Sequence, residues 1–247
     1  MAGKFDKLPK ARLVSRKNIA RGLMIIKIKP EARIEFESGQ YCTIVVDDIA
    51  RPYSVVSAPS EEFLEFFIEL VPNGELTSKL WQLQVGEMLR IAPKAKGRFL
   101  FQPNYKNHLM VSTVTGIASF VSMLRRLRLS DYNQEPKRER CELMIFHGAS
   151  YQDEFGYSEE LSAMSDEKSL NLTYIPTVSR PSDVRNSGWS GTIGRVNQVF
   201  EDFLNRTQYI SSDTIVYACG HPGMIEKVKK TSQLRGLSFQ EESYFRI

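Results

Sequence analysis

The sequence lacks several features that would assign it to a class at once. Its apolar runs all fall short of the ~20 residues of a membrane-spanning helix, so we expect no membrane span. Residues 1–7 contain no apolar core of the kind found in signal peptides. The three cysteines, Cys42, Cys141 and Cys219, are too widely spaced for a zinc or iron–sulfur pattern. We therefore expect no metal site, and a reducing cytoplasm as the setting.

Strong charge is also lacking. The formal net charge is +4, and no basic stripe interleaved with aromatic side chains runs along the chain. We expect no nucleic-acid partner, whereas a mildly positive surface suits an acidic protein partner. The sequence contains no internal repeat and no low-complexity segment. Its 247 residues, 42% of them hydrophobic, are typical of a globular chain with one large domain or two small ones.

Short runs of alternating polarity, separated by turns, fill the first hundred residues. Such runs predict an antiparallel β-barrel or sandwich, with one helix near residues 75–84 at an open end. The expected strands lie within residues 13–29, 41–46, 52–57, 64–70, 87–92 and 97–100.

After a polar, turn-prone stretch at residues 101–107, apolar runs alternate with helical patterns. This alternation predicts a doubly wound parallel sheet covered on both faces, which binds ligands at the carboxyl ends of its strands. We place the domains at residues 1–103 and 104–247. The expected strands are 108–113, 141–147, 170–176 and 214–219, and the expected helices are 117–129, 159–164, 196–204 and 224–234.

Two segments of the first half carry groups suited to a nucleotide. Arg51 provides a planar cation for a phosphate, Tyr53 a flat ring and Ser54 a hydroxyl. Further along, Gly74 ends a turn and residues 77–78, Thr and Ser, start a short helix, whose free N–H groups favour phosphate. Taken alone, the first segment could equally be an ordinary strand, and the second an ordinary capped helix.

In the second half, the informative residues follow the ends of expected strands. Thr115 and Gly116 open a helix after the first strand, a position suited to a pyrophosphate. Arg180 follows the third strand, preceded by Ser179, and together with the later Arg195 it could grip a phosphate. The alternative is two separate surface arginines.

The last expected strand ends at Cys219 and Gly220. A thiol at this position is well placed beside a bound ligand, but a buried cysteine is more often structural.

The order and spacing of these segments resemble the bacterial, FAD-containing form of the ferredoxin–NADP reductase family. Residues 51–54 match its Arg-x-Tyr-Ser motif, residues 74–77 its Gly-x-x-Ser/Thr motif, and residues 219–224 its Cys-Gly-x-Pro-x-Met motif. The resemblance covers nearly the whole chain. At three positions the chain departs from the pattern: Val114 replaces a Gly, Ser119 a Pro, and Ser150 an Arg of bacterial relatives.

The resemblance implies that FAD binds in the barrel. In the family, the Arg of the first motif holds the FAD pyrophosphate, the Tyr stacks on the flavin, and the Ser faces the hydride-accepting nitrogen. A terminal aromatic residue helps to cover FAD. The residues implied to contact FAD are Arg51, Tyr53, Ser54, Gly74, Thr77, Ser78 and either Tyr244 or Phe245.

The resemblance also implies that NADP(H) binds in the α/β domain. The loop after the first strand would receive its pyrophosphate, a Ser-Arg pair and a later Arg its 2′-phosphate, and the last strand end its nicotinamide. The corresponding residues are Thr115, Gly116, Ser179, Arg180, Arg195, Cys219 and Gly220.

The implied function is hydride transfer between NADP(H) and FAD, coupled to single-electron exchange with ferredoxin or flavodoxin. We expect a cytoplasmic monomer in which Ser54 and Cys219 act at the reacting rings. Two alternatives remain: the flavin reductase component of an oxygenase, and a non-catalytic flavin or nucleotide sensor.

Overall fold

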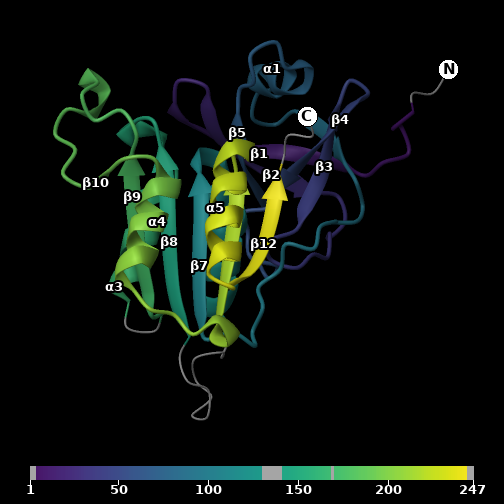
Figure 1. Cartoon of the computed structure of the whole chain (residues 1–247). Coiled ribbons are helices and arrows are strands. Elements are labelled where there is room, and N and C mark those ends of the chain that lie inside the picture. The colour runs from purple at the N-terminus through teal and green to yellow at the C-terminus, as the bar shows by residue number, and fades with distance from the viewer. Residues whose placement is uncertain (1–3, 130–140, 168–169, 244–247) are drawn as a thin grey trace. The chain divides into compact units, whose positions relative to one another are not determined.

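The computed structural model describes residues 4–129, 141–167 and 170–243. The chain divides into two compact units (Figure 1). The first comprises Met1–Leu100 and Ala118–Arg126, and the second comprises Phe101–Ile117 and Leu127–Ile247. Every helix of the described part falls short of the length and apolarity that crossing a bilayer requires.

The first unit is built on a six-stranded antiparallel sheet with the order β4-β3-β6-β1-β2-β5. Beyond the edge strand β4, the N–H of Val56 donates to the carbonyl of Glu65 on the opposite edge strand, β5, with 2.8 Å between nitrogen and oxygen. The two edges therefore meet and the sheet curls into a barrel. Its strands are β1 (Lys10–Ala20), β2 (Leu23–Pro30), β3 (Tyr41–Val46), β4 (Ile49–Ser54), β5 (Leu64–Glu69) and β6 (Met88–Ile91).

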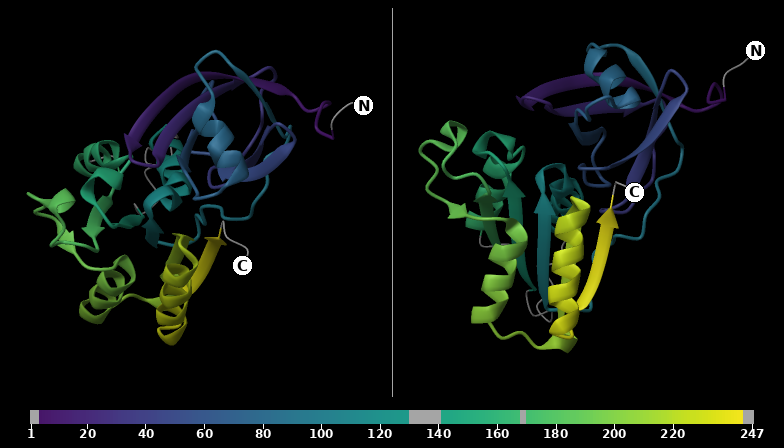
Figure 2. Two further views of the ribbon diagram at one scale, coloured as in Figure 1. Left: turned by 90° about the horizontal axis from the view of Figure 1, so that it is seen from above. Right: turned by 45° about the horizontal axis from the view of Figure 1, so that its top comes forward.

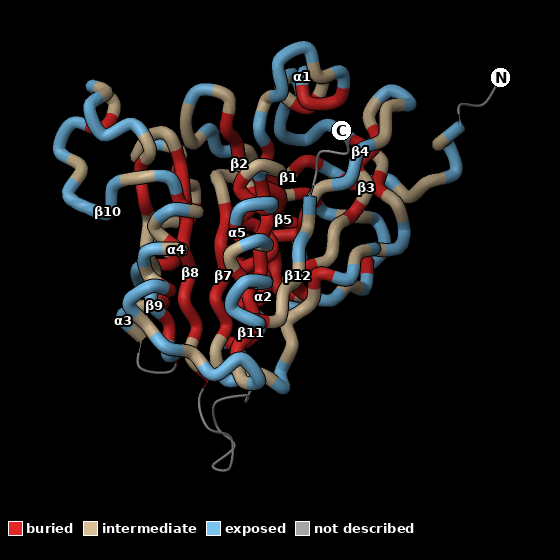
Figure 3. The backbone as a smooth tube through the Cα atoms, viewed as in Figure 1, coloured by how far each residue is buried: buried red, intermediate tan, exposed pale blue. Residues whose placement is uncertain are grey.

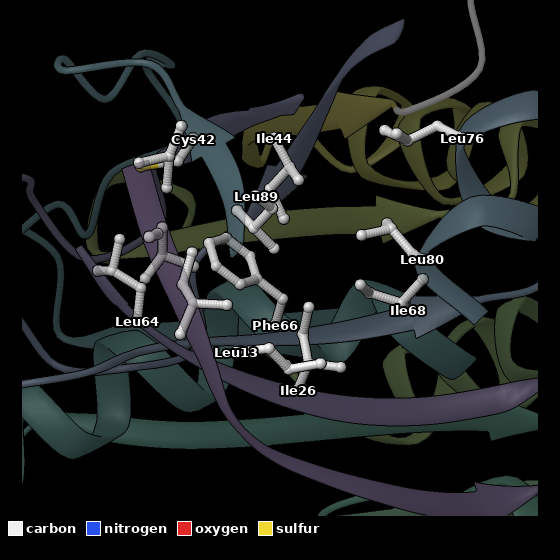
Figure 4. Close-up of a cluster of buried hydrophobic side chains, with 14 of the residues drawn as sticks. Leu13, Ile26, Cys42, Ile44, Leu64, Phe66, Ile68, Leu76, Leu80 and Leu89 are labelled. Carbon is white, nitrogen blue, oxygen red and sulfur yellow. The ribbon is translucent and has the colours of Figure 1, made fainter. Parts of the chain in front are cut away.

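A single apolar core fills this barrel (Figure 4). Alternate residues of the strands, such as Ile26 and Ile28 on β2, point into it because successive side chains of a strand face opposite sides. Helix α1 (Glu75–Gln82) adds Leu76 and Leu80, which lie one turn apart on the same face. Burying each such side chain contributes about 1.5–3 kcal/mol.

The second unit is built on a six-stranded parallel sheet with the order β10-β9-β8-β7-β11-β12. From the central strand β7 the chain builds the sheet first toward β9 and then, through β11, in the other direction. The point where the order reverses therefore lies between β7 and β11. The strands are β7 (Asn107–Thr113), β8 (Glu142–Ala149), β9 (Leu172–Val178), β10 (Thr192–Ile193), β11 (Thr214–Gly220) and β12 (Ser238–Ser243).

Helices α4 (Val196–Arg206) and α5 (Pro222–Leu234) lie side by side on one face of this sheet (Figures 1 and 2). They bury Phe200 and Val228 against Val111 and Val216 of the central strands. Strands β8 and β11 are buried along almost their whole length (Figure 3), as expected for a parallel sheet with both faces covered. The other helices are α2 (Ala118–Leu129) and α3 (Ser158–Asp166), and short 3₁₀ segments include η1 (Val114–Ile117), η3 (Gln152–Glu154) and η4 (Val184–Asn186).

The predicted fold class is confirmed: an antiparallel barrel followed by a parallel α/β sheet. One expected strand is wrong, because residues 97–100 form no ladder and only Lys96 bridges Tyr41. Gly97, with φ +113°, turns the chain away at this point.

Candidate cofactor sites

On strand β4 of the barrel unit, Arg51 and Tyr53 lie two residues apart and Ser54 follows them. Arg51 is exposed, Tyr53 packs partly against the core, and Ser54 is buried. Burial raises the pKa of Tyr53 to about 12, and the charge of Arg51 opposes this only in part. Tyr53 therefore stays a neutral phenol across the physiological range, with its ring fixed by packing.

The fold brings Arg51 to the amino-terminal end of α1. Its Nη2 lies 3.7 Å from Oε2 of Glu75, in the first turn of that helix, and its Nη1 donates to the Ala50 carbonyl at 2.8 Å. The first N–H groups of a helix have no partner within the helix. A guanidinium beside such a helix start is a suitable place for a phosphate group.

Gly74 is the N-cap of α1, and its missing side chain is a packing requirement. A Cβ at this position would lie 2.6 Å from Oγ1 of Thr77. The Thr77 hydroxyl accepts from the N–H of Val71 at 3.3 Å, and the Ser78 hydroxyl donates to the Gly74 carbonyl at 2.7 Å. These two hydroxyls shape the turn, so the backbone N–H groups of the helix start are the donors suited to an anion.

Ser54 contacts a residue that the sequence did not point to as a site residue. The hydroxyl of Ser119, in the first turn of α2, donates to the hydroxyl of Ser54 at 3.2 Å, and both side chains are buried. The same helix is tied to the barrel residues by Ser122, whose hydroxyl donates to the Ser57 carbonyl at 2.7 Å. In the sequence, the signal for this contact was Ser119 itself, which stands where the family pattern has Pro.

In the α/β unit, the predicted residues of the β7 loop and of the β11 end lie against each other at the reversal point of the sheet. A Cβ on Gly116 would lie 2.3 Å from the Cys219 carbonyl oxygen. Gly220 has φ +129°, and a Cβ there would lie 2.2 Å from Oγ1 of Thr113. The N–H of His221 donates to that same Oγ1 at 2.8 Å. Only glycine fits at residues 116 and 220, so the start of η1, which includes Thr115, packs directly against the end of β11.

The 2′-phosphate candidates lie at the carboxyl ends of β9 and β10. Ser179 and Arg180 follow β9, and the N–H of Ser179 donates to the Ala149 carbonyl at the end of β8. Arg195 is the N-cap of α4 and follows Gly194, whose N–H donates to the Val178 carbonyl at 2.9 Å. All three residues are thus at the same edge of the sheet.

Sequence reasoning missed two neighbours of Arg180. Its Nη1 donates to the hydroxyl of Tyr151 at 2.7 Å. On the same ring lies Arg185, whose guanidinium carbon is 3.7 Å from the ring centroid and which is also paired with Asp153 at 2.6 Å. Tyr151 lies two residues after the end of β8. This position at a strand end was the signal in the sequence that could have pointed to it.

Two predicted FAD contacts, Tyr244 and Phe245, lie outside the described residues. Cys219 is fully buried at the end of β11, and it pairs in register with Ser112 of β7. Within the described part of the chain, no cluster of His, Cys, Asp and Glu is suited to hold a metal ion.

Both sets of residues fit the cofactors expected from the sequence. In the barrel unit, a cation and a helix start meet beside a fixed aromatic ring. In the α/β unit, two loops meet at the reversal point, where Gly116 and Gly220 let their backbones pack closely. Dinucleotides bind at such a point in doubly wound sheets.

Family models match both units. The model described as an oxidoreductase FAD-binding domain matches residues 10–100, and the model described as an oxidoreductase NAD-binding domain matches residues 110–230.

Individual relatives match nearly the full length. The chain is 27% identical to protein RfbI of Salmonella typhimurium over 97% of this chain and 68% of the relative. It is 30% identical to the ferredoxin–NADP reductase of Pseudomonas aeruginosa over 83% of this chain and 81% of the relative. A solved ferredoxin NADP+ reductase of Neisseria gonorrhoeae, with bound FAD and NADP, has a TM-score of 0.81 at 22% identity and covers 97% of this chain and 99% of its own.

Proposed function

Because the chain belongs to the ferredoxin–NADP reductase family, we propose that it passes electrons from NADPH through FAD to ferredoxin or flavodoxin. Its FAD-binding and NAD-binding domains make it an oxidoreductase that transfers hydride between NADP(H) and FAD. Bound FAD accepts two electrons together and releases them singly, which links a two-electron donor to one-electron carriers. The identity of the acceptor is the part we propose.

The observation that carries the proposal is the approach of two loops at the reversal point of the parallel sheet. Gly116 and Gly220 allow this approach, since any side chain there would overlap Cys219 or Thr113. A cofactor on this surface would contact backbone N–H groups rather than side chains.

We assign the FAD contacts to residues 1–103. Arg51 and the start of α1 would hold the pyrophosphate, Tyr53 would lie against the flavin, and Ser54 would direct its hydroxyl at the hydride-accepting nitrogen. The 3.7 Å separation of Arg51 and Glu75, which places the guanidinium at the helix start, supports the first assignment. The turn residues Gly74, Thr77 and Ser78 shape this start.

We assign the NADP(H) contacts to residues 104–247. Thr115 and Gly116 would receive the pyrophosphate, and Cys219 and Gly220 would lie beside the nicotinamide, where a small buried thiol leaves room for two flat rings. At the other end of the cofactor, the 2′-phosphate would meet the residues at the edge formed by β9 and β10: Ser179, Arg180 and Arg195.

The protein's residues need not act as nucleophiles or bases in this reaction. Their task is to hold two cofactors in register, and orientation of bound reactants can remove about 7–11 kcal/mol of a barrier at most. We place the enzyme in the cytoplasm, and three buried cysteines that form no disulfide bond support this placement.

The test combines cofactor content with turnover. The purified protein should be yellow, release FAD on denaturation, and reduce ferricyanide with NADPH. A panel of ferredoxin, flavodoxin and an oxygenase component, each assayed with NADPH, then identifies the acceptor. A protein that binds FAD but reduces none of these acceptors would be a sensor and not a reductase.

A further inference from the structure

The loop after β7 contains a backbone conformation that its sequence disfavours. Val114, the first residue of η1, has φ +41°. A β-branched side chain is rarely found in this left-handed region, because its Cβ approaches the neighbouring backbone. Such a conformation persists only where the surroundings fix it.

The ring of His147 fixes the carbonyl of Val114. Its Nε2 lies 3.0 Å from the Val114 oxygen, and its Nδ1 lies 3.1 Å from the hydroxyl of Tyr174. A carbonyl can only accept, so Nε2 carries the proton and Nδ1 accepts from the tyrosine. One tautomer therefore satisfies both bonds.

His147 is itself held rigidly. It is fully buried on β8, next to β7 in the sheet, and the ring of Phe155 meets it edge-on at 5.0 Å. Burial lowers the pKa of His147 to about 4, and the bond to the Val114 carbonyl opposes this only in part, so the ring is neutral at physiological pH.

Other contacts hold the two sides of the loop. The Val114 side chain packs on a small cluster of Ala149, Phe155 and Val178. On the β11 side, Gly116 lies directly against the carbonyl of Cys219. The His147 bond is thus the polar contact that secures the carbonyl of the strained residue itself.

We propose that His147 is a positioning residue for the dinucleotide: its Nε2–H holds the Val114 carbonyl, and thereby keeps the N–H groups of η1 aimed at the pyrophosphate of NADP(H). This inference rests on the proposed function, which places the pyrophosphate at that loop. It gives His147 a role beyond that of a core histidine, because the group it holds belongs to the binding loop.

The chain offers a matched control in His108. This histidine is also fully buried, on β7, and it has the same two kinds of partner: the Tyr105 carbonyl 3.0 Å from Nε2 and the Tyr217 hydroxyl 3.3 Å from Nδ1. It lies at the start of β7, the end opposite the loop. Replacing it should disturb the core in a similar way without touching η1.

The experiment measures NADP+ binding by calorimetry, and thermal unfolding, for the FAD-loaded wild type and three single variants. His147→Leu removes the donor, His147→Gln offers another N–H donor, and His108→Leu is the control. We expect His147→Leu to raise the Kd for NADP+ about tenfold, the equivalent of about 1.4 kcal/mol. His147→Gln should recover part of this loss, and His108→Leu should lower the melting temperature without changing the Kd.

A second-site change separates positioning from general packing. Glycine adopts φ +41° without being held, so Val114→Gly in the His147→Leu background should restore most of the NADP+ affinity. The KM for NADPH should follow the Kd across the series, with kcat changing less.

Two results would overturn this inference and leave the proposed function standing. In the first, the wild type binds NADP+ and His147→Leu has the same Kd. In the second, His108→Leu loses as much affinity for NADP+ as His147→Leu does. A wild type with no affinity for NADP+ would overturn the proposed function, and the inference with it.

Discussion

The hydroxyl of Ser119 donates to the hydroxyl of Ser54, with 3.2 Å between the oxygens. A hydroxyl has one proton to donate and two lone pairs. Since Ser54 accepts from Ser119, its own proton is directed elsewhere, and the accepted bond makes Ser54 a stronger donor. Residue 119 thus influences a side chain that the proposed function places at the flavin.

We therefore expect Ser54→Ala to slow flavin reduction by NADPH while FAD stays bound, and Ser119→Ala to slow it less. A net hydrogen bond contributes about 0.5–1.5 kcal/mol, which corresponds to roughly two- to tenfold in rate. Stopped-flow absorbance of the flavin measures the rate. Ser122→Ala, which removes another buried hydroxyl of α2, is the control and should leave it unchanged. Equal rates in wild type and Ser54→Ala would remove Ser54 from the mechanism.

Arg51→Ala should purify with much less FAD. Hydrogen bonds to charged groups contribute about 1.5–3 kcal/mol, so the Kd for FAD should rise by roughly ten- to a hundredfold. Fluorescence titration of the apoprotein with FAD measures this. Arg21→Ala, at an exposed position between β1 and β2, is the matched control. Full FAD content in Arg51→Ala would contradict the assignment of the phosphate contact.

The enzyme should prefer NADPH to NADH through Arg180 and Arg195. The two cofactors differ by one 2′-phosphate, and two charge-assisted contacts could give about a hundredfold preference, reduced by salt. The ratio of kcat/KM for the two cofactors should fall in Arg180→Ala and in Arg195→Ala, mainly through KM. Arg206→Ala, at the other end of α4, should keep the wild-type ratio. A wild type that uses both cofactors equally would rule out a 2′-phosphate contact by Arg180 and Arg195.

Stability should fall as the pH is lowered from about 6.5 toward 5, because both buried histidines bind protons more weakly in the folded state. Burial lowers the pKa of His108 and of His147 to about 4, from an ordinary value of 6.5. Their contribution is complete above the unfolded pKa and is lost as the pH falls toward the folded one. The slope should approach about 1.4 kcal/mol per pH unit for each histidine.

Urea unfolding at several pH values between 7.5 and 5 measures this slope. His108→Gln removes one of the two titrating rings and should roughly halve it. A wild-type free energy of unfolding that stays constant over this range would show that the rings become protonated without unfolding.

The sequence predicted the elements whose apolar pattern is strong, such as β3 and β11, because burial alone determines them. It did not predict β12, whose residues Ser238–Ser243 are largely polar. That strand forms because its backbone pairs in parallel with β11. It lies at the edge of the sheet, where polar side chains are tolerated. A contact of this kind cannot be read from local periodicity.

The candidate binding residues divide in the same way. Residues that belong to a contiguous motif, such as Arg51 and Cys219, could be named from the sequence. The stack of Arg185 on Tyr151 could not, because it joins segments after two different strands. Nor could the sequence show that Val114 takes the conformation usual for glycine, since neighbours such as His147 impose it.

The close approach of Gly116 to Cys219 and of Gly220 to Thr113 has a consequence for how this site can evolve. Each loop occupies the space in which the other would carry a side chain, although about a hundred positions separate them along the chain. A methyl group gained by either loop must be accommodated by a shift of the other, so the two can diverge only together. Introducing a loop that carries a side chain at residue 116 or 220 should therefore fail, unless the facing loop is changed with it.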